Sequence, residues 1–247
     1  MKPDAILFDL DNTLILFDEQ DFFSNYTREL TDFFNDLIDP KSFVKRLLDS
    51  TQKLVQNDGK LLNIDFFMNS FTHGLDINLD ILLARFDRFY KLKFSRLRKI
   101  AKTIPGASEI VHDLAADGYR LVIASNPLLP LEAQWMRIGW ADMADLSYKL
   151  VTGIDNSNYC KPRIEYYQEI CRKIDLPPEA CLMVGNDPYN DIIAAKTGMR
   201  TYLTTDSAHM SIELSRELAA HMKLDYPQPD HMGSITSLKD CIDSLVN

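Results

Sequence analysis

The sequence of 247 residues lacks several features that would assign it to particular classes of protein. No apolar run approaches the roughly 20 residues that a transmembrane helix needs. The amino-terminal stretch MKPDAILFDLD reaches acidic residues too early for the apolar core of a secretory signal peptide. Internal repeats and low-complexity tracts are also missing. We therefore expect a cytoplasmic protein with no membrane partner.

Cysteine is scarce and shows no metal-binding pattern. The four cysteines are Cys160, Cys171, Cys181 and Cys241. They form no CxxC pair, and the five histidines are scattered along the chain. This spacing argues against the common structural zinc sites and predicts free, mostly buried thiols in a reducing compartment.

Basic residues are outnumbered, with 27 Lys and Arg against 36 Asp and Glu and a net charge of −9. Nucleic acids and anionic membranes attract basic surfaces, so we expect neither as a partner. A small anionic substrate is still compatible with this charge, because a bound metal ion reverses the local sign. The composition, 46% hydrophobic and 26% charged, is that of an ordinary globular protein.

Short apolar runs without alternation predict four buried parallel strands. They are AILF (5–8), LVIA (121–124), CLMV (181–184) and TYL (201–203). Helical patterns at 106–118 and 191–197 alternate with these runs, and each ends at a glycine. The alternation predicts an α/β fold, an open parallel sheet with crossover helices.

Residues 15 to about 104 interrupt this rhythm with four amphipathic helical patterns. Asp39-Pro40 is typical of a helix start, and IPGA (104–107) marks the return to the sheet. We therefore predict two units, a core of residues 1–14 and 105–247 and a helical insertion of residues 15–104. After about residue 206 we expect an irregular loop followed by a last helix.

Asp9 and Asp11 follow the first predicted strand, one residue apart. The carboxyl ends of parallel strands form the ligand crevice of open sheets. Two neighbouring carboxylates raise the cost of each other's ionisation unless a cation lies between them. Mg²⁺, which prefers oxygen ligands, removes that cost. A simple turn explains the pair equally well when it is taken alone.

Further polar residues follow the later strands or lie near their ends. They are Ser125, Asn126, Lys161, Asn186, Asp187 and Asp191. Each has an ordinary explanation, such as a helix cap or a surface lysine. Their appearance in this order, near the strand ends that a parallel sheet brings together, favours a single polar site instead.

The set resembles the haloacid dehalogenase superfamily, the aspartate-nucleophile phosphohydrolases. Its first motif, DxDx[TV], is matched by Asp9, Asp11 and Thr13, its second by Ser125 and its third by Lys161. The resemblance covers residues 4–15 and about 105–205. It implies a Rossmann-like core, with the helical insertion placed as a cap domain.

The fourth motif, GNDPYND, departs from the usual Gly-Asp form, because Asn186 follows Gly185 and Asp187 comes next. Asp187 and Asp191 keep a D-x-x-x-D spacing that the family also uses. We favour Asp187 as a metal ligand, with Asp191 as a more distant or water-mediated partner. The alternative is that the amide oxygen of Asn186 binds the metal instead.

The resemblance implies a Mg²⁺-dependent phosphatase acting on a small phosphorylated metabolite. Asp9 would be the nucleophile and Asp11 the general acid and base, while Ser125 and Lys161 would bind the phosphoryl oxygens. Mg²⁺ would be held by Asp9, by the backbone carbonyl of Asp11 and by the fourth motif. Thr13 would support the loop geometry, and Asn126 would help to orient substrate or loop.

Three alternatives to a phosphatase are open, and the phosphomutase among them would use the same residues. A metal-independent dehalogenase is disfavoured, because such family members typically lack the second aspartate of the first motif, which is Asp11 here. A phosphomutase would return the phosphoryl group to its substrate, and a non-catalytic member would bind a phosphorylated ligand without turnover. The sequence does not identify the substrate or the oligomeric state.

Overall fold

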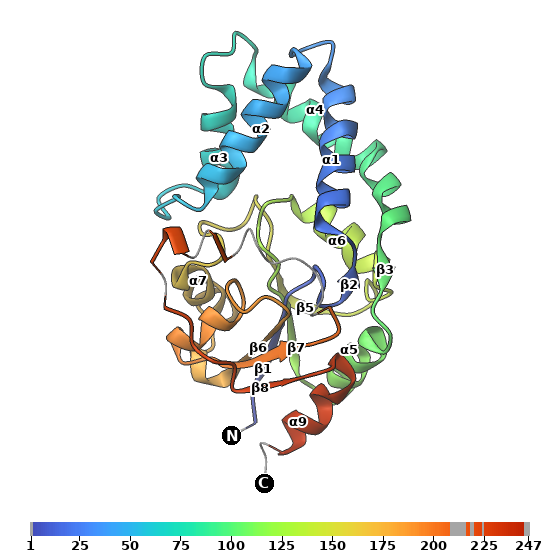
Figure 1. Ribbon diagram of the computed structural model, residues 1–247, viewed down its shortest axis with the longest axis vertical. Coiled ribbons are helices and arrows are strands. Elements are labelled where there is room, and N and C mark those ends of the chain that lie inside the picture. Colours follow the sequence, from blue (N-terminus) through green and yellow to red (C-terminus); the bar gives the residue numbers. More distant parts are fainter. Residues whose placement is uncertain (1, 208–215, 218–219, 224, 245–247) are drawn as a thin grey trace.

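The computed structural model describes residues 2–207, 216–217, 220–223 and 225–244. Its centre is a six-stranded parallel sheet with the strand order β5-β4-β1-β6-β7-β8 (Figure 1). The strands are β1 (Ala5–Phe8), β4 (Arg120–Ile123), β5 (Tyr148–Val151), β6 (Cys181–Gly185), β7 (Arg200–Thr204) and β8 (His231–Gly233). The predicted Rossmann-like core is confirmed, and the four predicted strands are β1, β4, β6 and β7.

Helices cover both faces of the sheet, and β1 shows how one strand contributes to two cores. Its side chains alternate between the faces, as strand geometry requires. Ala5 and Leu7 belong to one buried cluster, and Ile6 and Phe8 to the other. Helix α7 and the 3-10 helix η3 pack in the first cluster, and α5, α6 and α9 in the second. These elements are α5 (Ala107–Ala116), α6 (Leu131–Trp140), α7 (Ile164–Ile174), η3 (Ile192–Thr197) and α9 (Leu238–Ser244).

Two strands of the six-stranded sheet were not predicted from the sequence. β5 has alternating exposure and lies at one edge of the sheet, so it lacks the continuous apolar run of a central strand. β8 has three residues, lies at the other edge and exposes 62% of Met232. The sequence predicted an irregular loop there, followed by a helix. The helix is α9, and residues 208–215, 218–219 and 224 of the expected loop lie outside the described residues.

Four helices between β1 and α5 pack together above the sheet (Figure 1). They are α1 (Glu19–Phe34), α2 (Pro40–Leu54), α3 (Asn63–Thr72) and α4 (Leu79–Leu92), followed by the 3-10 helix η1 (Phe94–Ile100). Asp39 caps α2, because its side chain accepts a hydrogen bond from the backbone of Ser42 at 3.0 Å. The four predicted helical patterns thus correspond to four helices.

The chain passes between the helical block and the sheet through a short antiparallel ribbon. Its strands are β2 (Ile15–Leu16) and β3 (Lys102–Thr103). The two crossing points are therefore tied together by backbone pairing. This ribbon fixes the helical block directly over the residues that follow β1.

The helical block has a core of aromatic rings. The ring of Phe34 lies 4.9 Å from Phe43 and 4.6 Å from Phe86, and Phe43 lies 5.5 Å from Phe71, between ring centroids. These four side chains come from all four helices. Offset and edge-to-face contacts of this kind stabilise aromatic clusters beyond simple burial.

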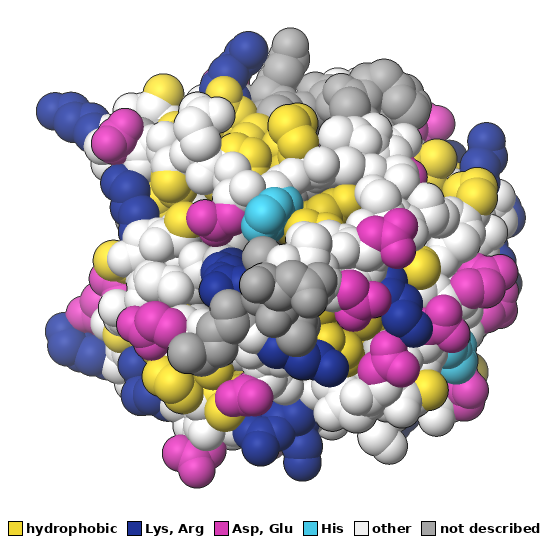
Figure 2. Space-filling view, turned by 90° about the horizontal axis from the view of Figure 1, so that it is seen from below, with side chains coloured by type: hydrophobic (Ala, Val, Ile, Leu, Met, Phe, Trp, Pro, Cys, Tyr) yellow, Lys and Arg dark blue, Asp and Glu magenta, His cyan; other side chains and the backbone are white. Residues whose placement is uncertain are grey.

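Acidic and basic side chains are interspersed on the end of the molecule opposite the helical block (Figure 2). None of the helices formed by the described residues is both long and apolar enough to cross a membrane. All four cysteines are free, as predicted, and three of them are buried.

Candidate active site

The carboxyl ends of three neighbouring strands bring the predicted polar residues to one place. The backbone N–H of Asp9 donates to the carbonyl of Val184 at 2.9 Å, so β1 is tied to β6 at this point. On the other side, the N–H of Ala124 donates to the carbonyl of Phe8 at 2.7 Å. Asp9, Ser125 and Gly185 therefore sit beside one another at the sheet edge where open α/β folds bind ligands.

Lys161 reaches this edge from the loop before α7 and joins two carboxylates. Its ammonium group lies 2.8 Å from Asp9 Oδ1 and 2.6 Å from Asp191 Oδ1, and its side chain is 1% exposed. Burial by itself would lower the pKa of Lys161, but Asp191 and Asp9 raise it well above the ordinary value. The site therefore contains a permanent buried cation next to Asp9.

Thr13 connects the first and fourth motifs. Its hydroxyl lies 3.2 Å from Asp9 Oδ2 and 3.1 Å from Asn186 Oδ1, within hydrogen-bond distance of both. The side chain of Thr13 is fully buried. The Thr13 hydroxyl thus contacts both the amide oxygen of Asn186 and the carboxylate of Asp9.

Asp187 faces the turn that follows it. Its Oδ1 accepts hydrogen bonds from the backbone N–H of Tyr189 at 2.7 Å and of Asn190 at 3.1 Å. Its Oδ2 accepts from the Asn190 amide at 3.0 Å. These contacts hold the turn between β6 and η3 in place.

Gly185 and Asp191 are in close contact. A Cβ placed on Gly185 would lie 2.1 Å from Asp191 Oδ2. The same carboxylate oxygen accepts the backbone N–H of Asp187 at 3.0 Å. A glycine at this position therefore lets Asp191 approach the strand end and reach Lys161.

Ser125 and Asn126 are held at the end of β4 by their backbone and amide groups. The carbonyl of Ser125 accepts hydrogen bonds from Thr152 Oγ1 at 2.6 Å and from the Tyr166 hydroxyl at 2.8 Å. Asn126 Oδ1 accepts the backbone N–H of Lys161 at 3.3 Å. The second and third motifs are therefore joined directly.

Arg137 is a site residue that the sequence analysis missed. It projects from α6, is 1% exposed, and forms an ion pair with Asp11. Its Nη1 donates to Gln134 Oε1 at 2.6 Å. Burial lowers the pKa of Arg137 to about 10, so the guanidinium stays charged at neutral pH. The available signal was a charged residue on the face of α6 that also buries Ala133 and Ile138.

Asn12, directly after the second motif aspartate, shapes the loop that follows and was also missed. Its backbone has φ 58°, a left-handed conformation that asparagine tolerates better than most residues. Its Oδ1 accepts the N–H of Phe17 at 3.1 Å, and its carbonyl accepts the Ser207 hydroxyl at 2.7 Å. The loop after Asp11 is thereby turned toward the helical block.

A cavity of about 860 Å³ extends from Asp11 into the helical block. Asp11, Asn126 and Arg137 line it on the side of the sheet, and residues of α1 to α4 line it on the other side. The side chain of Asp11 is 37% exposed, whereas that of Asp9 is 11% exposed. Asp11 therefore lies between the buried polar cluster and the cavity.

The family is shown by comparison with known proteins. The family model of the haloacid dehalogenase-like hydrolases matches residues 3–198 of this chain. The chain belongs to this family. Membership agrees with the aspartate pair, the buried lysine and the strand-end geometry, and it makes the chain a hydrolase of the haloacid dehalogenase type.

Curated relatives of this hydrolase carry phosphatase names. A glyceraldehyde 3-phosphate phosphatase from Pyrococcus furiosus is 26% identical over 62% of each chain. A protein of the same name from Methanothermobacter thermautotrophicus is 30% identical over 47% of this chain and 48% of its own. This hydrolase therefore spans less than two thirds of the length of either relative. The pyrophosphatase PpaX of Bacillus cereus is 23% identical over 81% of this chain and 82% of its own.

Solved structures share the fold of this hydrolase. A 2-haloacid dehalogenase from Pseudomonas syringae has a TM-score of 0.62 and 18% identity, and covers 99% of this chain and 100% of its own. A phosphatase of the same superfamily from Thermococcus onnurineus has a TM-score of 0.56 and 19% identity, and covers 98% of each chain. At these identities the likeness shows the fold alone.

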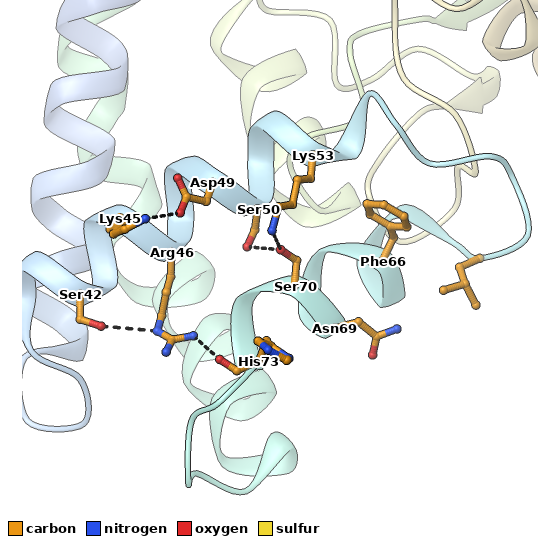
Figure 3. Close-up of a pocket in the computed structure, with 11 residues that line it drawn as sticks. Ser42, Lys45, Arg46, Asp49, Ser50, Lys53, Phe66, Asn69, Ser70 and His73 are labelled. Atoms are coloured by element: carbon orange, nitrogen blue, oxygen red, sulfur yellow. Dashed lines mark hydrogen bonds and ion pairs between the residues drawn. The ribbon is translucent and has the colours of Figure 1, made fainter.

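A second hollow of the hydrolase, of about 690 Å³, lies between α2 and α3 (Figure 3). Its basic side chains have partners within the protein. Arg46 donates to the carbonyls of Phe71 and His73 at 2.9 and 2.7 Å, and Lys45 lies 2.7 Å from Asp49. It contains none of the motif residues, so we assign it no part in the chemistry.

Proposed function

We propose that the chain is a Mg²⁺-dependent phosphatase that hydrolyses a small phosphorylated metabolite through a phosphorylated Asp9. The observation that carries the proposal is the pairing of Lys161 with Asp9 at the end of β1, with Asp11 next to it at the mouth of the cavity. A buried nucleophile beside a fixed cation suits attack on an anionic phosphate. An acid placed toward the cavity suits a leaving group that lies there.

In the first step, an Asp9 carboxylate oxygen attacks phosphorus and the bond from phosphorus to the ester oxygen breaks. Asp11 donates its proton to that ester oxygen, so the leaving group departs as a neutral alcohol. In the second step, water attacks phosphorus and Asp11 takes a proton from it. The bond to Asp9 then breaks, and inorganic phosphate leaves.

Lys161 and Ser125 would hold the phosphoryl oxygens through both steps. Lys161 has the fixed positive charge, and Ser125 is held at the adjacent strand end by Thr152 and Tyr166. Asn126 keeps the lysine loop against β4 through the Lys161 N–H. Groups that are in place before reaction stabilise transferring charge without reorganisation.

A Mg²⁺ site at Asp9 would need oxygen ligands from neighbouring residues. Among the described residues, no group of three or more His, Cys, Asp and Glu is arranged to hold a metal by itself. A mixed set fits instead, with the Asp9 carboxylate, the backbone carbonyl of Asp11 and the fourth-motif amide or carboxylate. When bound, Mg²⁺ would neutralise phosphoryl charge.

The contacts of the fourth motif favour Asn186 over Asp187 as this ligand. The Thr13 hydroxyl lies within hydrogen-bond distance of both Asn186 Oδ1 and Asp9 Oδ2. Asp187 uses both of its oxygens in the following turn, and Asp191 binds Lys161. Asp191 then acts by positioning Lys161.

We also infer that residues 15–104 act as a cap domain over a core of residues 1–14 and 105–247. The β2–β3 ribbon lies at both crossing points, and α1 to α4 form the far wall of the cavity. A cap that covers the site limits the access of water and of bulky partners.

Hydrolysis of p-nitrophenyl phosphate, with and without Mg²⁺, tests the proposal. We expect turnover that needs the metal and falls by at least about 10⁴-fold in Asp9→Asn. Asp4→Asn is the matched control, because Asp4 is exposed at the opposite end of β1 and its hydrogen bonds to other described residues are made by its backbone. Borohydride trapping during turnover should convert residue 9 to homoserine, detectable by peptide mass spectrometry. Equal activity in Asp9→Asn, or an unmodified residue 9, would refute the nucleophile assignment.

A further inference from the structure

We propose that the cavity selects phosphate monoesters whose leaving group is an uncharged, largely apolar alcohol, and rejects leaving groups that carry an anion. This inference rests on the proposed function, because it concerns the alcohol side of the same reaction. It follows from the size, the wall chemistry and the charge of the space that begins at Asp11.

The size of the cavity exceeds what a short polyol needs. Pockets of about 300–1,000 Å³ enclose ligands of drug size, and this one has about 860 Å³. A two- or three-carbon alcohol would leave most of that space to water. A ring-sized apolar group would displace this water and gain from burial.

The wall on the side of the insertion is mainly apolar. Phe22 from α1, Phe67 from α3 and Phe86 from α4 line it, together with aliphatic side chains. The polar groups of Tyr26 and Tyr90 are neutral, since their hydroxyls lie 2.6 Å apart and burial raises the pKa of Tyr26 to about 12. The wall therefore suits an apolar group with at most one or two neutral polar atoms.

The charge of the lining is negative. Six acidic residues line the cavity in addition to Asp11: Asp18, Glu19, Asp87, Glu132, Asp155 and Glu217. Burial raises the pKa of Glu19 to about 7, but five other acidic groups remain. Among the lining residues that the structure describes, Arg137 is the single Lys or Arg, and its guanidinium is paired with Asp11.

An anionic leaving group would therefore enter an acidic cavity in which the described residues offer no uncommitted Lys or Arg to receive it. Burying a charge without a partner is costly, and nearby like charges add to the cost. The catalytic lysine offers no help, because Lys161 binds Asp9 and Asp191 below the cavity. A second phosphate or a carboxylate on the leaving group is thus disfavoured.

Three esters with the same type of alkyl bond to phosphate test the inference in the presence of Mg²⁺. They are ethyl phosphate, 2-phenylethyl phosphate and 2-(4-carboxyphenyl)ethyl phosphate. The last two differ by one carboxylate. We expect kcat/KM for the phenyl ester to exceed that of the ethyl ester by at least about tenfold. The carboxylated ester should be at least about tenfold slower than the phenyl ester.

Lysine substitutions on α1 isolate the charge effect. Phe23 lines the cavity and is 40% exposed, so Phe23→Lys adds a cation at the rim without opening a buried core. Exposed Ser24, the next residue, does not line the cavity, and Ser24→Lys is the matched control. We expect Phe23→Lys to reduce the discrimination against the carboxylated ester by several-fold and Ser24→Lys to leave it unchanged.

The results separate the inference from the proposed function. Asp9-dependent hydrolysis with equal rates for the three esters, or fastest for the carboxylated one, would overturn the inference and leave the phosphatase standing. An equal effect of both lysine variants would also overturn it. The absence of Asp9-dependent hydrolysis of all three esters and of p-nitrophenyl phosphate would refute the phosphatase and the inference together.

Discussion

Arg137 forms an ion pair with Asp11, although the two residues are 126 positions apart in the chain and Arg137 belongs to none of the four motifs. The guanidinium is buried between α6 and the cavity, and it also binds Gln134. It fixes the direction of the carboxylate that we propose as the general acid and base. The catalytic pair is therefore positioned from two sides, Asp9 by Lys161 and Asp11 by Arg137.

Replacing Arg137 should lower kcat with little change in KM. In Arg137→Met the apolar stem is largely kept but the ion pair is lost, so Asp11 is free to rotate away from the leaving oxygen. Misplacement of a catalytic group by about 1 Å costs on the order of 100-fold in rate. Steady-state kinetics on one ester, together with thermal unfolding, would measure this. Arg137→Lys should recover part of the rate, and an unchanged kcat in Arg137→Met would show that the pair is only structural.

Asn186→Ala and Asp187→Ala should separate metal binding from support of the turn. We expect Asn186→Ala to raise the Mg²⁺ concentration for half-maximal activity by at least about 10-fold, since losing even a residue that only supports a metal ligand costs about 10- to 100-fold. Asp187→Ala should mainly lower the free energy of unfolding, by about 1–2 kcal/mol, because it removes hydrogen bonds to residues 189 and 190. Mg²⁺ titrations and urea unfolding measure the two effects. The opposite ranking in Mg²⁺ titrations would return the ligand role to Asp187.

Gly185→Ala should destabilise the protein and displace Asp191 from its ion pair with Lys161. The added Cβ would meet Asp191 Oδ2 at 2.1 Å, and forced overpacking in a core costs about 1–3 kcal/mol. Gly139→Ala in α6 is the control, since its Cβ would have ordinary contact with Ala144 at 3.8 Å. The control should be neutral or stabilising by about 0.5–1 kcal/mol. Equal unfolding free energies for the two variants would contradict the close approach of Asp191.

His112 should titrate above its ordinary value and stabilise the fold at lower pH. Its Nδ1 lies 2.7 Å from the Ser108 carbonyl and its Nε2 lies 3.2 Å from Asp145, and these contacts raise its pKa despite partial burial. Because the folded pKa is raised, the stabilisation is complete below about pH 6.5, the ordinary value, and is lost as the pH rises through the folded pKa. NMR titration of the imidazole would show the shift, and Asp145→Asn should reduce it. A midpoint at or below 6.5 would disprove the prediction.

The sequence identified the site residues that stand next to a recognisable local pattern, namely an apolar strand followed by polar residues. The four central strands are apolar without alternation because they are covered on both faces, and the polar residues at their ends stand out for the same reason. Asp9, Ser125 and Gly185 follow from this pattern, because parallel strands must bring their carboxyl ends to one edge. The edge strands β5 and β8 carry no such pattern and were missed.

The sequence by itself determined the α/β class, the helical insertion and the motif residues, because short-range periodicity and strand-end polarity encode them. Only the tertiary structure decided which groups meet. It paired Arg137 with Asp11 and brought the amide oxygen of Asn186 to the Thr13 hydroxyl. It directed the Asp187 carboxylate to the backbone N–H groups of residues 189 and 190. It also placed acidic and aromatic side chains from four helices around one cavity. Such contacts depend on the packing of segments far apart in the chain, and local sequence patterns do not specify that packing.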